Sequence, residues 1–276
     1  MQYRDVVLLS DLDATLFSSD GSISEGNRRA ICAFVEGGGM FGVATGRAKD
    51  NAARFLPGIP LNAPSVLFNG AAVYHYETGR YSDCRHIDGA LARSVIVWCR
   101  EHAPALDIQV YTRDAIAYVT PEETANKPYL DIHRPCKFCT AEELAGEDWI
   151  KLLIFGPEAE QKAAEAMLCA RGLDRAFEIM QGTTDIVRDA KYFELLPAGV
   201  NKGTGVRTVR ALPETAGRKI FCIGDYWNDA AMLREADVSF APENAIGEIR
   251  AMADHVVPDN NSDAVAHIIT DWIPRL

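Results

Sequence analysis

The 276-residue sequence contains no apolar run long enough to span a bilayer, no internal repeat and no low-complexity tract. Its opening residues, Met1 to Asp5, lack the basic and apolar regions of a secretory signal. Lysine and arginine are not clustered, and the formal net charge is −11 at pH 7. Because nucleic-acid backbones are held by clustered cations, this composition argues against a nucleic-acid partner. We therefore expect a cytoplasmic protein without membrane or nucleic-acid partners, acting as a monomer or weak homodimer.

The sequence also has few cysteines at the spacings typical of a disulfide framework or a zinc site. The seven cysteines are an odd number, and most are dispersed through apolar segments, as is typical of reduced thiols. Cys136 and Cys139 form a C-x-x-C pair shortly after His133, a spacing compatible with a zinc or redox role. The sequence offers no second pair, so ordinary loop or strand cysteines are the default interpretation.

An apolar run near the N-terminus, Val6 to Leu9, ends in two carboxylates, Asp11 and Asp13. Such a run predicts a strand buried on both faces of a parallel sheet, and ligands of α/β sheets bind beyond the carboxyl ends of strands. Two neighbouring acids repel each other unless a divalent cation or a shared proton offsets their charge. The alternative, a solvated turn, is open for this motif taken alone.

The alternation of strands and helices predicts the fold class. A helix over 30–36, a strand over 40–44 and a helix over 48–55 follow the first strand, and the right-handed crossover places Thr45 beside Asp11. The alternation resumes with a strand over 193–196, and 83–189 has mixed short strands and two helices. We expect an α/β protein: a Rossmann-like core of residues 1–82 and 190–276, with a mainly parallel sheet covered on both faces by helices, and an inserted α+β domain of residues 83–189.

A third apolar strand, 219–223, ends in Gly224-Asp225-Tyr226-Trp227-Asn228-Asp229, and Lys202 opens a helix. Together the strand ends supply carboxylates, a hydroxyl and a cation, which is an inventory for handling a phosphoryl group. Each residue has a plainer interpretation: Thr45 as a helix cap, Lys202 as a solvated first-turn lysine, and Asn228 and Asp229 as helix-capping residues. Their joint occurrence argues against the purely structural interpretation.

These motifs, in this order, resemble the haloacid dehalogenase superfamily, and within it the Cof-type, sugar-phosphatase-like branch with a large α/β cap. The turn Phe68-Asn69-Gly70-Ala71 and the stretch from Glu194 to Gly203 are similar to that branch as well, so the resemblance spans essentially the whole chain.

The resemblance implies an Mg²⁺-dependent phosphatase acting on a small phosphorylated metabolite, such as a sugar phosphate. Asp11 would be the nucleophile that forms an aspartyl-phosphate, and Asp13 the general acid and base. Asp11, the backbone carbonyl of Asp13 and Asp225 would hold Mg²⁺, with Asp229 close by in a supporting position. The implied phosphate-binding groups are Leu12 (amide), Thr45, Gly46, Lys202 and Asn228.

Substrate choice is expected to reside in the inserted cap, residues 83–189. Asn69 and Gly70 are expected near the entrance of the core by resemblance. Arg47 is interpreted as a structural or rim residue. The cap residues that could meet a polar substrate are Tyr111, Arg113, Tyr129, His133 and Arg134, although a surface or core position is the default for each.

Two departures from the family pattern concern the site. Ala14 stands where the family usually has glycine, and at positive φ it would cost on the order of 1 kcal/mol. Tyr226 and Trp227 place large aromatics in the last motif, where we favour packing under the cap over narrowing of the entrance. Two further functions remain open: a phosphomutase or phosphotransferase with the same motifs, and a non-catalytic ligand-binding module, which the intact acidic motifs disfavour.

Overall fold

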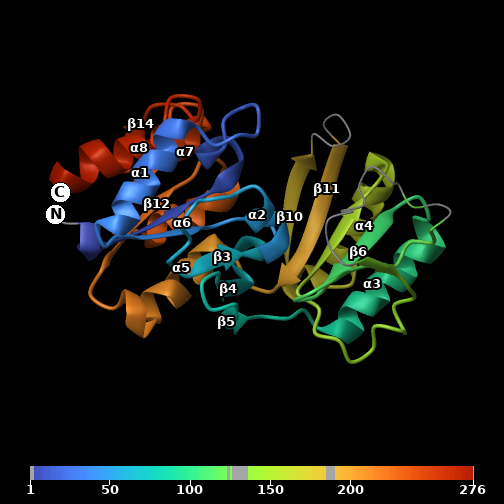
Figure 1. Ribbon diagram of the computed structural model, residues 1–276. Helices are drawn as coiled ribbons and strands as arrows, with labels where there is room; N and C mark the ends of the chain where they lie inside the picture. Colours follow the sequence, from blue (N-terminus) through green and yellow to red (C-terminus); the bar gives the residue numbers. More distant parts are fainter. Residues whose placement is uncertain (1–2, 123–124, 126–135, 185–189, 276) are drawn as a thin grey trace. The chain divides into compact units, whose positions relative to one another are not determined.

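The computed structural model describes residues 3–122, 125, 136–184 and 190–275 (Figure 1). The chain divides into two compact units, one of Met1–Cys84 with Asn201–Leu276 and one of Arg85–Val200. Within the described ranges, none of the helices combines the length and the apolar character that crossing a membrane requires. The predicted α/β class, with an inserted α+β region, is confirmed.

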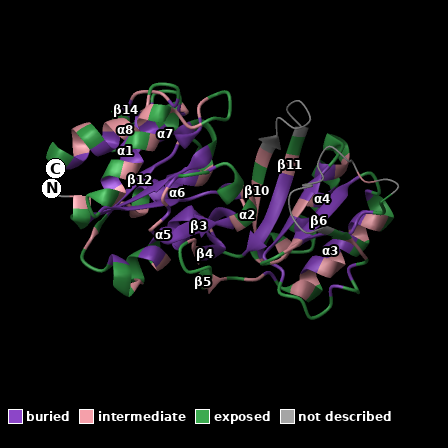
Figure 2. Cartoon of the chain, viewed as in Figure 1, coloured by how far each residue is buried: buried purple, intermediate pink, exposed green. Residues whose placement is uncertain are grey.

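The first unit is built on a sheet of five parallel strands in the order β14-β13-β12-β1-β2. The strands are β1 (Val6–Ser10), β2 (Met40–Val43), β12 (Lys219–Ile223), β13 (Val238–Pro242) and β14 (His255–Val257). All five residues of β1 are buried, as the continuous apolar run predicts for a strand covered on both faces (Figure 2). β1 is an interior strand, paired with β12 on one side and with the edge strand β2 on the other.

Helices cover both faces of this sheet. They are α1 (Glu25–Glu36), α2 (Lys49–Arg54), α5 (Lys202–Ala211), α6 (Ala230–Glu235), α7 (Gly247–Met252) and α8 (Ala264–His267). Val206 of α5 and Leu233 of α6 share a hydrophobic core with Leu9 of β1. Figure 1 shows α1 and α8 side by side, and Ser24 caps α1 by accepting from the Asn27 amide.

A small antiparallel sheet of β3 (Ser65–Leu67), β4 (Ala72–His75) and β5 (Arg80–Cys84) completes the first unit. A bridge between Ala44 and Val66 joins β3 to the end of β2. Short helical turns of the first unit lie at Tyr3–Asp5, Leu12–Leu16, Phe68–Gly70, Pro213–Thr215, Trp227–Asp229, Ile268–Trp272 and Ile273–Arg275, and one of the second unit lies at Leu173–Arg175.

The second unit contains a six-stranded sheet in the order β10-β11-β9-β6-β7-β8, antiparallel except for the β7–β8 pair. The strands are β6 (Asp107–Tyr111), β7 (Ile116–Tyr118), β8 (Cys136–Phe138), β9 (Lys151–Phe155), β10 (Phe177–Thr184) and β11 (Ala190–Pro197). The helices α3 (Gly89–His102) and α4 (Glu158–Ala170) pack through Cys99 and Leu168 into a core with Ile108, Leu152 and Leu195. This unit therefore has a hydrophobic core of its own.

One expectation about the organisation is wrong. The strand predicted over 193–196 was assigned to the first unit, but β11 pairs with β9 and β10 in the sheet of the second unit. The units accordingly meet at 84/85 and 200/201, rather than at 82/83 and 189/190. The sequence of an apolar strand does not indicate which sheet the strand joins, because pairing partners such as Phe193 and Ile154 are distant in sequence.

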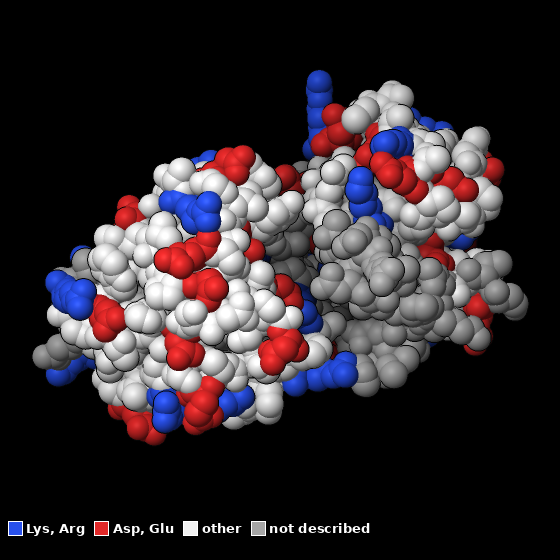
Figure 3. Space-filling model, turned by 90° about the horizontal axis from the view of Figure 1, so that it is seen from above, with Lys and Arg blue, Asp and Glu red and all other residues white. Residues whose placement is uncertain are grey.

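Surface charge is mixed. On the face shown in Figure 3, basic and acidic side chains are interspersed, without a continuous basic patch.

Candidate active site

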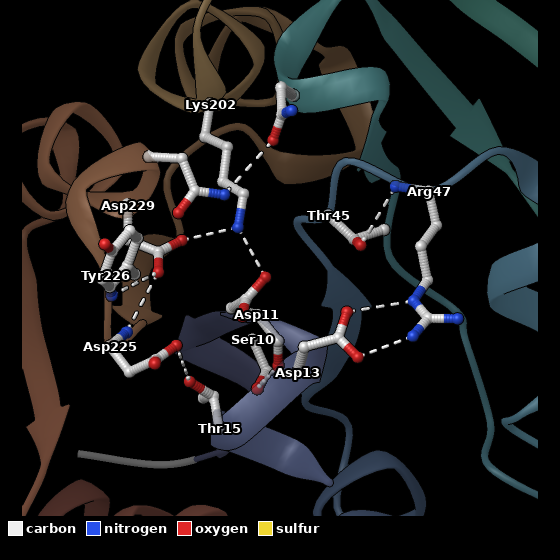
Figure 4. A network of polar contacts seen from close by, with 12 residues as sticks. Ser10, Asp11, Asp13, Thr15, Thr45, Arg47, Lys202, Asp225, Tyr226 and Asp229 are labelled. Carbon is white, nitrogen blue, oxygen red and sulfur yellow. Dashed lines mark hydrogen bonds and ion pairs between the residues drawn. The ribbon is translucent and has the colours of Figure 1, made fainter. Parts of the chain in front are cut away.

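Three strand ends meet at one edge of the parallel sheet. Asp11 follows β1, Asp225 follows β12 and Thr45 follows β2, and β1 lies between the other two strands. Parallel pairing therefore brings together side chains that are more than two hundred residues apart in sequence. Figure 4 shows the polar network that they form. The predicted neighbourhood of Asp11 and Thr45 at this edge is confirmed.

Asp11 is the buried centre of this network. Its side chain accepts a hydrogen bond from Lys202 Nζ at 2.5 Å, and its backbone amide donates to the carbonyl of Ile223 at 3.0 Å. Burial raises the pKa of Asp11 well above its usual value; the Lys202 charge opposes this shift, and the neighbouring carboxylates reinforce it. A further positive charge near Asp11 would therefore stabilise its ionised form.

Lys202 is the first residue of α5 and is completely buried. Its ammonium group forms ion pairs with Asp11 and, at 2.6 Å, with Asp229. Burial alone would lower the pKa of Lys202, but the two carboxylates outweigh burial and raise it above its usual value. Asn201 caps the helix by accepting from the Thr204 amide. The interpretation of Lys202 as a solvated first-turn lysine is thus wrong.

Asp229 uses both of its carboxylate oxygens inside the protein. One oxygen accepts from Lys202, and the other accepts from the backbone amides of Asp225 at 3.0 Å and Tyr226 at 3.1 Å. Asp229 is fully buried. These contacts fix the position of the lysine and of the loop that carries Asp225, which suits a supporting position better than a direct metal contact.

The acidic side chains suit a divalent cation. Ligand oxygens of Asp11, Asp225 and Asp229 lie within 4.8 Å of one another, and among the described residues this is the one grouping of acidic, histidine or cysteine side chains close enough to share a metal ion. Burial, reinforced by the charge of Asp229, raises the pKa of Asp225 to about 6. One Asp225 oxygen accepts from the Thr15 hydroxyl at 3.0 Å. Since Asp229 is engaged elsewhere, Asp11 and Asp225 are the carboxylates that fit a hard cation such as Mg²⁺.

Asp13 lies at the open side of the network and is held by Arg47, for which the sequence indicated only a structural or rim role. Arg47 donates from Nη2 to Asp13 Oδ1 at 2.6 Å and from Nε to Oδ2 at 3.0 Å. The expectation of a structural or rim role for Arg47 missed this contact. The available signal was its position two residues after Thr45, at the same sheet edge as Asp13.

The structure also locates the other residues that were expected to bind phosphate. Thr45 is buried, its hydroxyl accepts from the Arg47 amide at 3.2 Å, and α2 begins only at Lys49, so Thr45 is not the cap of that helix. Asn228 donates from Nδ2 to Asn69 Oδ1 at 3.3 Å. Leu12 is fully buried, and Gly46 is half-buried beside Thr45.

Gly70 has a packing role. It is buried with φ at +103°, and a Cβ atom built on it would lie 1.9 Å from the carbonyl oxygen of Asn201. The backbone of the 68–70 turn thus lies directly against the start of α5. The expected place of Gly70 near the entrance of the core stays a prediction.

The comparisons with known proteins agree with this geometry. The family model for haloacid dehalogenase-like hydrolases matches residues 8–269. The chain belongs to this family. This chain is 23% identical over 278 residues to the 5-amino-6-(5-phospho-D-ribitylamino)uracil phosphatase YitU of Bacillus subtilis, with 99% of each chain covered. It is 25% identical over 280 residues to YwtE of the same organism, which carries the same enzyme name, with 94% of this chain and 95% of YwtE covered.

Solved structures show the same fold. TM0651 from Thermotoga maritima aligns with a TM-score of 0.80 and 24% identity, covering 98% of this chain and 97% of that one. The HAD subclass IIB sugar phosphatase BT4131 aligns with a TM-score of 0.74 and 20% identity, covering 95% and 97%. The fold of this chain, with its parallel-sheet unit and its second unit, is therefore shared with these proteins.

The structure shows the backbone conformation of Ala14 and the exposure of Tyr226 and Trp227, the positions at which the chain departs from the family pattern. Ala14 has a left-handed backbone, with φ at 54° and ψ at 13°, and its carbonyl accepts from Asn244 Nδ2 at 2.8 Å. Tyr226 and Trp227 are 52% and 53% exposed, and their packing under the cap stays a prediction.

In the second unit of the haloacid dehalogenase-like hydrolase, few of the expected cap residues can be placed. The Tyr111 hydroxyl donates to Gln109 Oε1 at 2.9 Å, and Arg113 is exposed. Tyr129, His133 and Arg134 lie outside the described residues. Cys139 is a half-buried free thiol, and burial raises its pKa.

Proposed function

We propose that this hydrolase is an Mg²⁺-dependent phosphatase that cleaves phosphomonoesters of small metabolites through an aspartyl-phosphate on Asp11. The observation that carries the proposal is the buried carboxylate of Asp11, paired with Lys202 and set beside Asp225 at the end of the interior strand β1. A carboxylate at a strand end, held among groups that can bind phosphate and a cation, is suited to in-line attack on phosphorus.

The metal and the phosphate have separate holders in this proposal. Mg²⁺ held by Asp11, Asp225 and the backbone carbonyl of Asp13 would supply positive charge against the carboxylates and the phosphoryl oxygens. The phosphate oxygens are assigned to the amides of Leu12 and Gly46 and to the side chains of Thr45, Lys202 and Asn228. These donors are fixed before substrate arrives, so they stabilise the transition state without reorganisation.

The reaction takes two displacements. In the first, an Asp11 oxygen bonds to phosphorus while the bond from phosphorus to the alcohol oxygen breaks, and its electron pair stays on that oxygen, which takes a proton from Asp13. In the second, Asp13 takes a proton from water as the water oxygen bonds to phosphorus, and the bond from Asp11 to phosphorus breaks. The products are the alcohol, inorganic phosphate and the original enzyme.

The substrate is proposed to be a sugar phosphate or a related phosphorylated polyol. Two relatives carry the name 5-amino-6-(5-phospho-D-ribitylamino)uracil phosphatase, and one structural neighbour is named a sugar phosphatase. In this proposal residues 1–84 and 201–276 form the catalytic core, and residues 85–200 form the substrate-specificity cap. The boundaries follow the compact units of the structure.

The test is phosphate release from a panel of sugar phosphates and 5-amino-6-(5-phospho-D-ribitylamino)uracil, with Mg²⁺ and after its removal by a chelator. Native protein is compared with Asp11→Asn and with the surface variant Asp174→Asn. We expect turnover that requires Mg²⁺, disappears in Asp11→Asn and persists in Asp174→Asn. Transfer of phosphate between sugars without release would instead establish a mutase, and binding without turnover would establish a ligand-binding module.

A further inference from the structure

The side chain of Asp13 is 62% exposed, yet its carboxylate has a defined orientation. Arg47 contacts both oxygens, at 2.6 Å and 3.0 Å, in the fork arrangement that a guanidinium makes with a carboxylate. An exposed aspartate without such a partner rotates among several staggered positions. The paired arrangement removes that freedom at the position proposed to give and take the proton.

Arg47 is itself held from three sides. Its Nη1 donates to Asn51 Oδ1 at 2.9 Å, and its guanidinium carbon lies 4.8 Å from the centre of the Phe55 ring and 5.8 Å from that of Phe17. The two rings also contact each other, with centroids 6.0 Å apart. Phe17 is buried, so this support is anchored in the core of the first unit.

We propose that Arg47 is the positioning residue for Asp13: it fixes the carboxylate where the leaving alcohol and then the attacking water must meet it. The inference rests on the proposed function of Asp13. Figure 4 shows Asp13 pointing toward Arg47, on the side of the network away from Asp225 and Asp229. Arg47 thus acts on the proton-transfer group, while Lys202 acts on the nucleophile.

The fork is compatible with proton transfer. Each carboxylate oxygen has two acceptor positions, and Arg47 uses one on each oxygen. The shorter contact, from Nη2 to Oδ1, can hold the group while Oδ2 carries the proton that passes to the leaving alcohol. Lysine at this position would offer a single ammonium group, which holds one oxygen without fixing the plane of the carboxylate.

A different role for Arg47, direct binding of the substrate phosphate, has a different signature. A phosphate-binding cation contributes to every ester alike, because every ester carries the same phosphoryl group. A residue that positions the general acid matters only when the leaving alcohol needs a proton. The two roles therefore separate when esters with poor and good leaving groups are compared.

The experiment measures alcohol release in single turnovers with enzyme in excess, using a sugar phosphate that the native enzyme cleaves and 4-nitrophenyl phosphate. The variants are Arg47→Ala, Arg47→Lys and Asp13→Asn. Arg54→Ala is the matched control, since its guanidinium contacts the same Phe55 ring at 5.1 Å from the end of α2. The sugar alkoxide must be protonated as it leaves, whereas 4-nitrophenolate leaves unaided.

We expect Arg47→Ala to slow sugar-phosphate cleavage by about 10- to 100-fold and 4-nitrophenyl phosphate cleavage by less than about 3-fold, because misplacing the acid removes part of the roughly 10²–10⁴-fold that general acid catalysis contributes. Arg47→Lys should recover part of the loss, Asp13→Asn should show the same ester preference more strongly, and Arg54→Ala should match the native enzyme. Equal losses on both esters, or no loss, would overturn the role of Arg47. An Asp13→Asn variant without ester preference would overturn the proposed role of Asp13, and an inactive native enzyme would overturn the proposed function.

Discussion

At the scale of single residues, the site is organised by the distribution of charge around Lys202. A cation at the start of a helix faces the positive end of the helix dipole, and a buried cation loses its hydration. Both costs are offset here because two carboxylates, Asp11 and Asp229, contact the ammonium group directly. The residue that is least expected to be buried is therefore the one that joins the nucleophile to the loop after β12.

Ala14 carries a backbone cost that a single substitution can remove. Its φ of 54° places it in the left-handed region, which costs an L-residue about 1–2 kcal/mol, while glycine adopts it freely. Glycine loses more backbone entropy on folding, which offsets roughly half of the gain. We expect Ala14→Gly to raise the free energy of unfolding by about 0.5–1 kcal/mol, measured as a higher urea midpoint with an unchanged slope.

The control is the same substitution in an ordinary helix. Ala33 is exposed in α1, and Ala33→Gly should lower the free energy of unfolding by about 0.5–1 kcal/mol. The two substitutions are chemically identical but are expected to act in opposite directions. A loss of stability in Ala14→Gly would mean that the strain at φ 54° is not relieved by removing the methyl group.

At the scale of elements, local patterns predicted the strands and helices that carry the candidate site. The strand over 219–223 has the predicted bounds, and the helix that opens at Lys202 begins where expected, because apolar runs and capping residues are local signals. The contact of Arg47 with Asp13 could not be predicted in this way. It depends on how the ends of β1 and β2 pack, and on the Phe17 and Phe55 rings, which come from two separate turns.

The 68–70 turn offers a test of how one element positions another. A methyl group at Gly70 would overlap the carbonyl of Asn201, so Gly70→Ala must push the start of α5, and with it Lys202, away from Asp11. We expect a loss of about 2–4 kcal/mol in the free energy of unfolding from overpacking and the unfavourable φ. Phosphatase activity should fall on the order of 100-fold, because the displaced lysine no longer meets the nucleophile.

Gly247 is the matched control for this substitution. It begins α7, has no heavy atom within 4 Å of an added Cβ and has no positive φ. Gly247→Ala should leave activity unchanged and stabilise the chain by about 0.5–1 kcal/mol. Native-like activity in Gly70→Ala would show that the turn does not set the position of Lys202. Circular dichroism and urea unfolding establish that both variants fold.

At the scale of the whole molecule, the sequence predicted two units but placed their boundary too early. The change from alternating β-α elements to mixed short strands is a local pattern, and it located the first junction within a few residues of 84/85. The second junction could not be located in this way. β11 is apolar and immediately precedes Lys202, and only its pairing with Ile154 and other distant residues assigns it to the second unit.

Among the cysteines whose side chains the structure describes, Cys222 and Cys99 are fully buried, one in each unit, and the two thiols can report on the units separately. Cys222 lies in the core of the first unit, and Cys99 in that of the second. Burial raises the pKa of both thiols, that of Cys99 to about 11, so neither reacts until its unit opens. We expect Mg²⁺ with inorganic phosphate to slow iodoacetamide labelling of Cys222 about 10-fold at ligand concentrations near ten times Kd, without changing the labelling of Cys99.

This difference follows from where the ligand contacts lie. Asp11, Lys202 and Asp225 all belong to the first unit, so binding stabilises that unit directly, while the second unit has its own sheet and core. Mass spectrometry of labelled peptides separates the two sites, and the exposed thiol of Cys169 reports any direct effect of the ligands on the reagent. Equal slowing at Cys222 and Cys99 would mean that the two units unfold as one cooperative body. Slowing at Cys99 alone would place the phosphate contacts in the second unit.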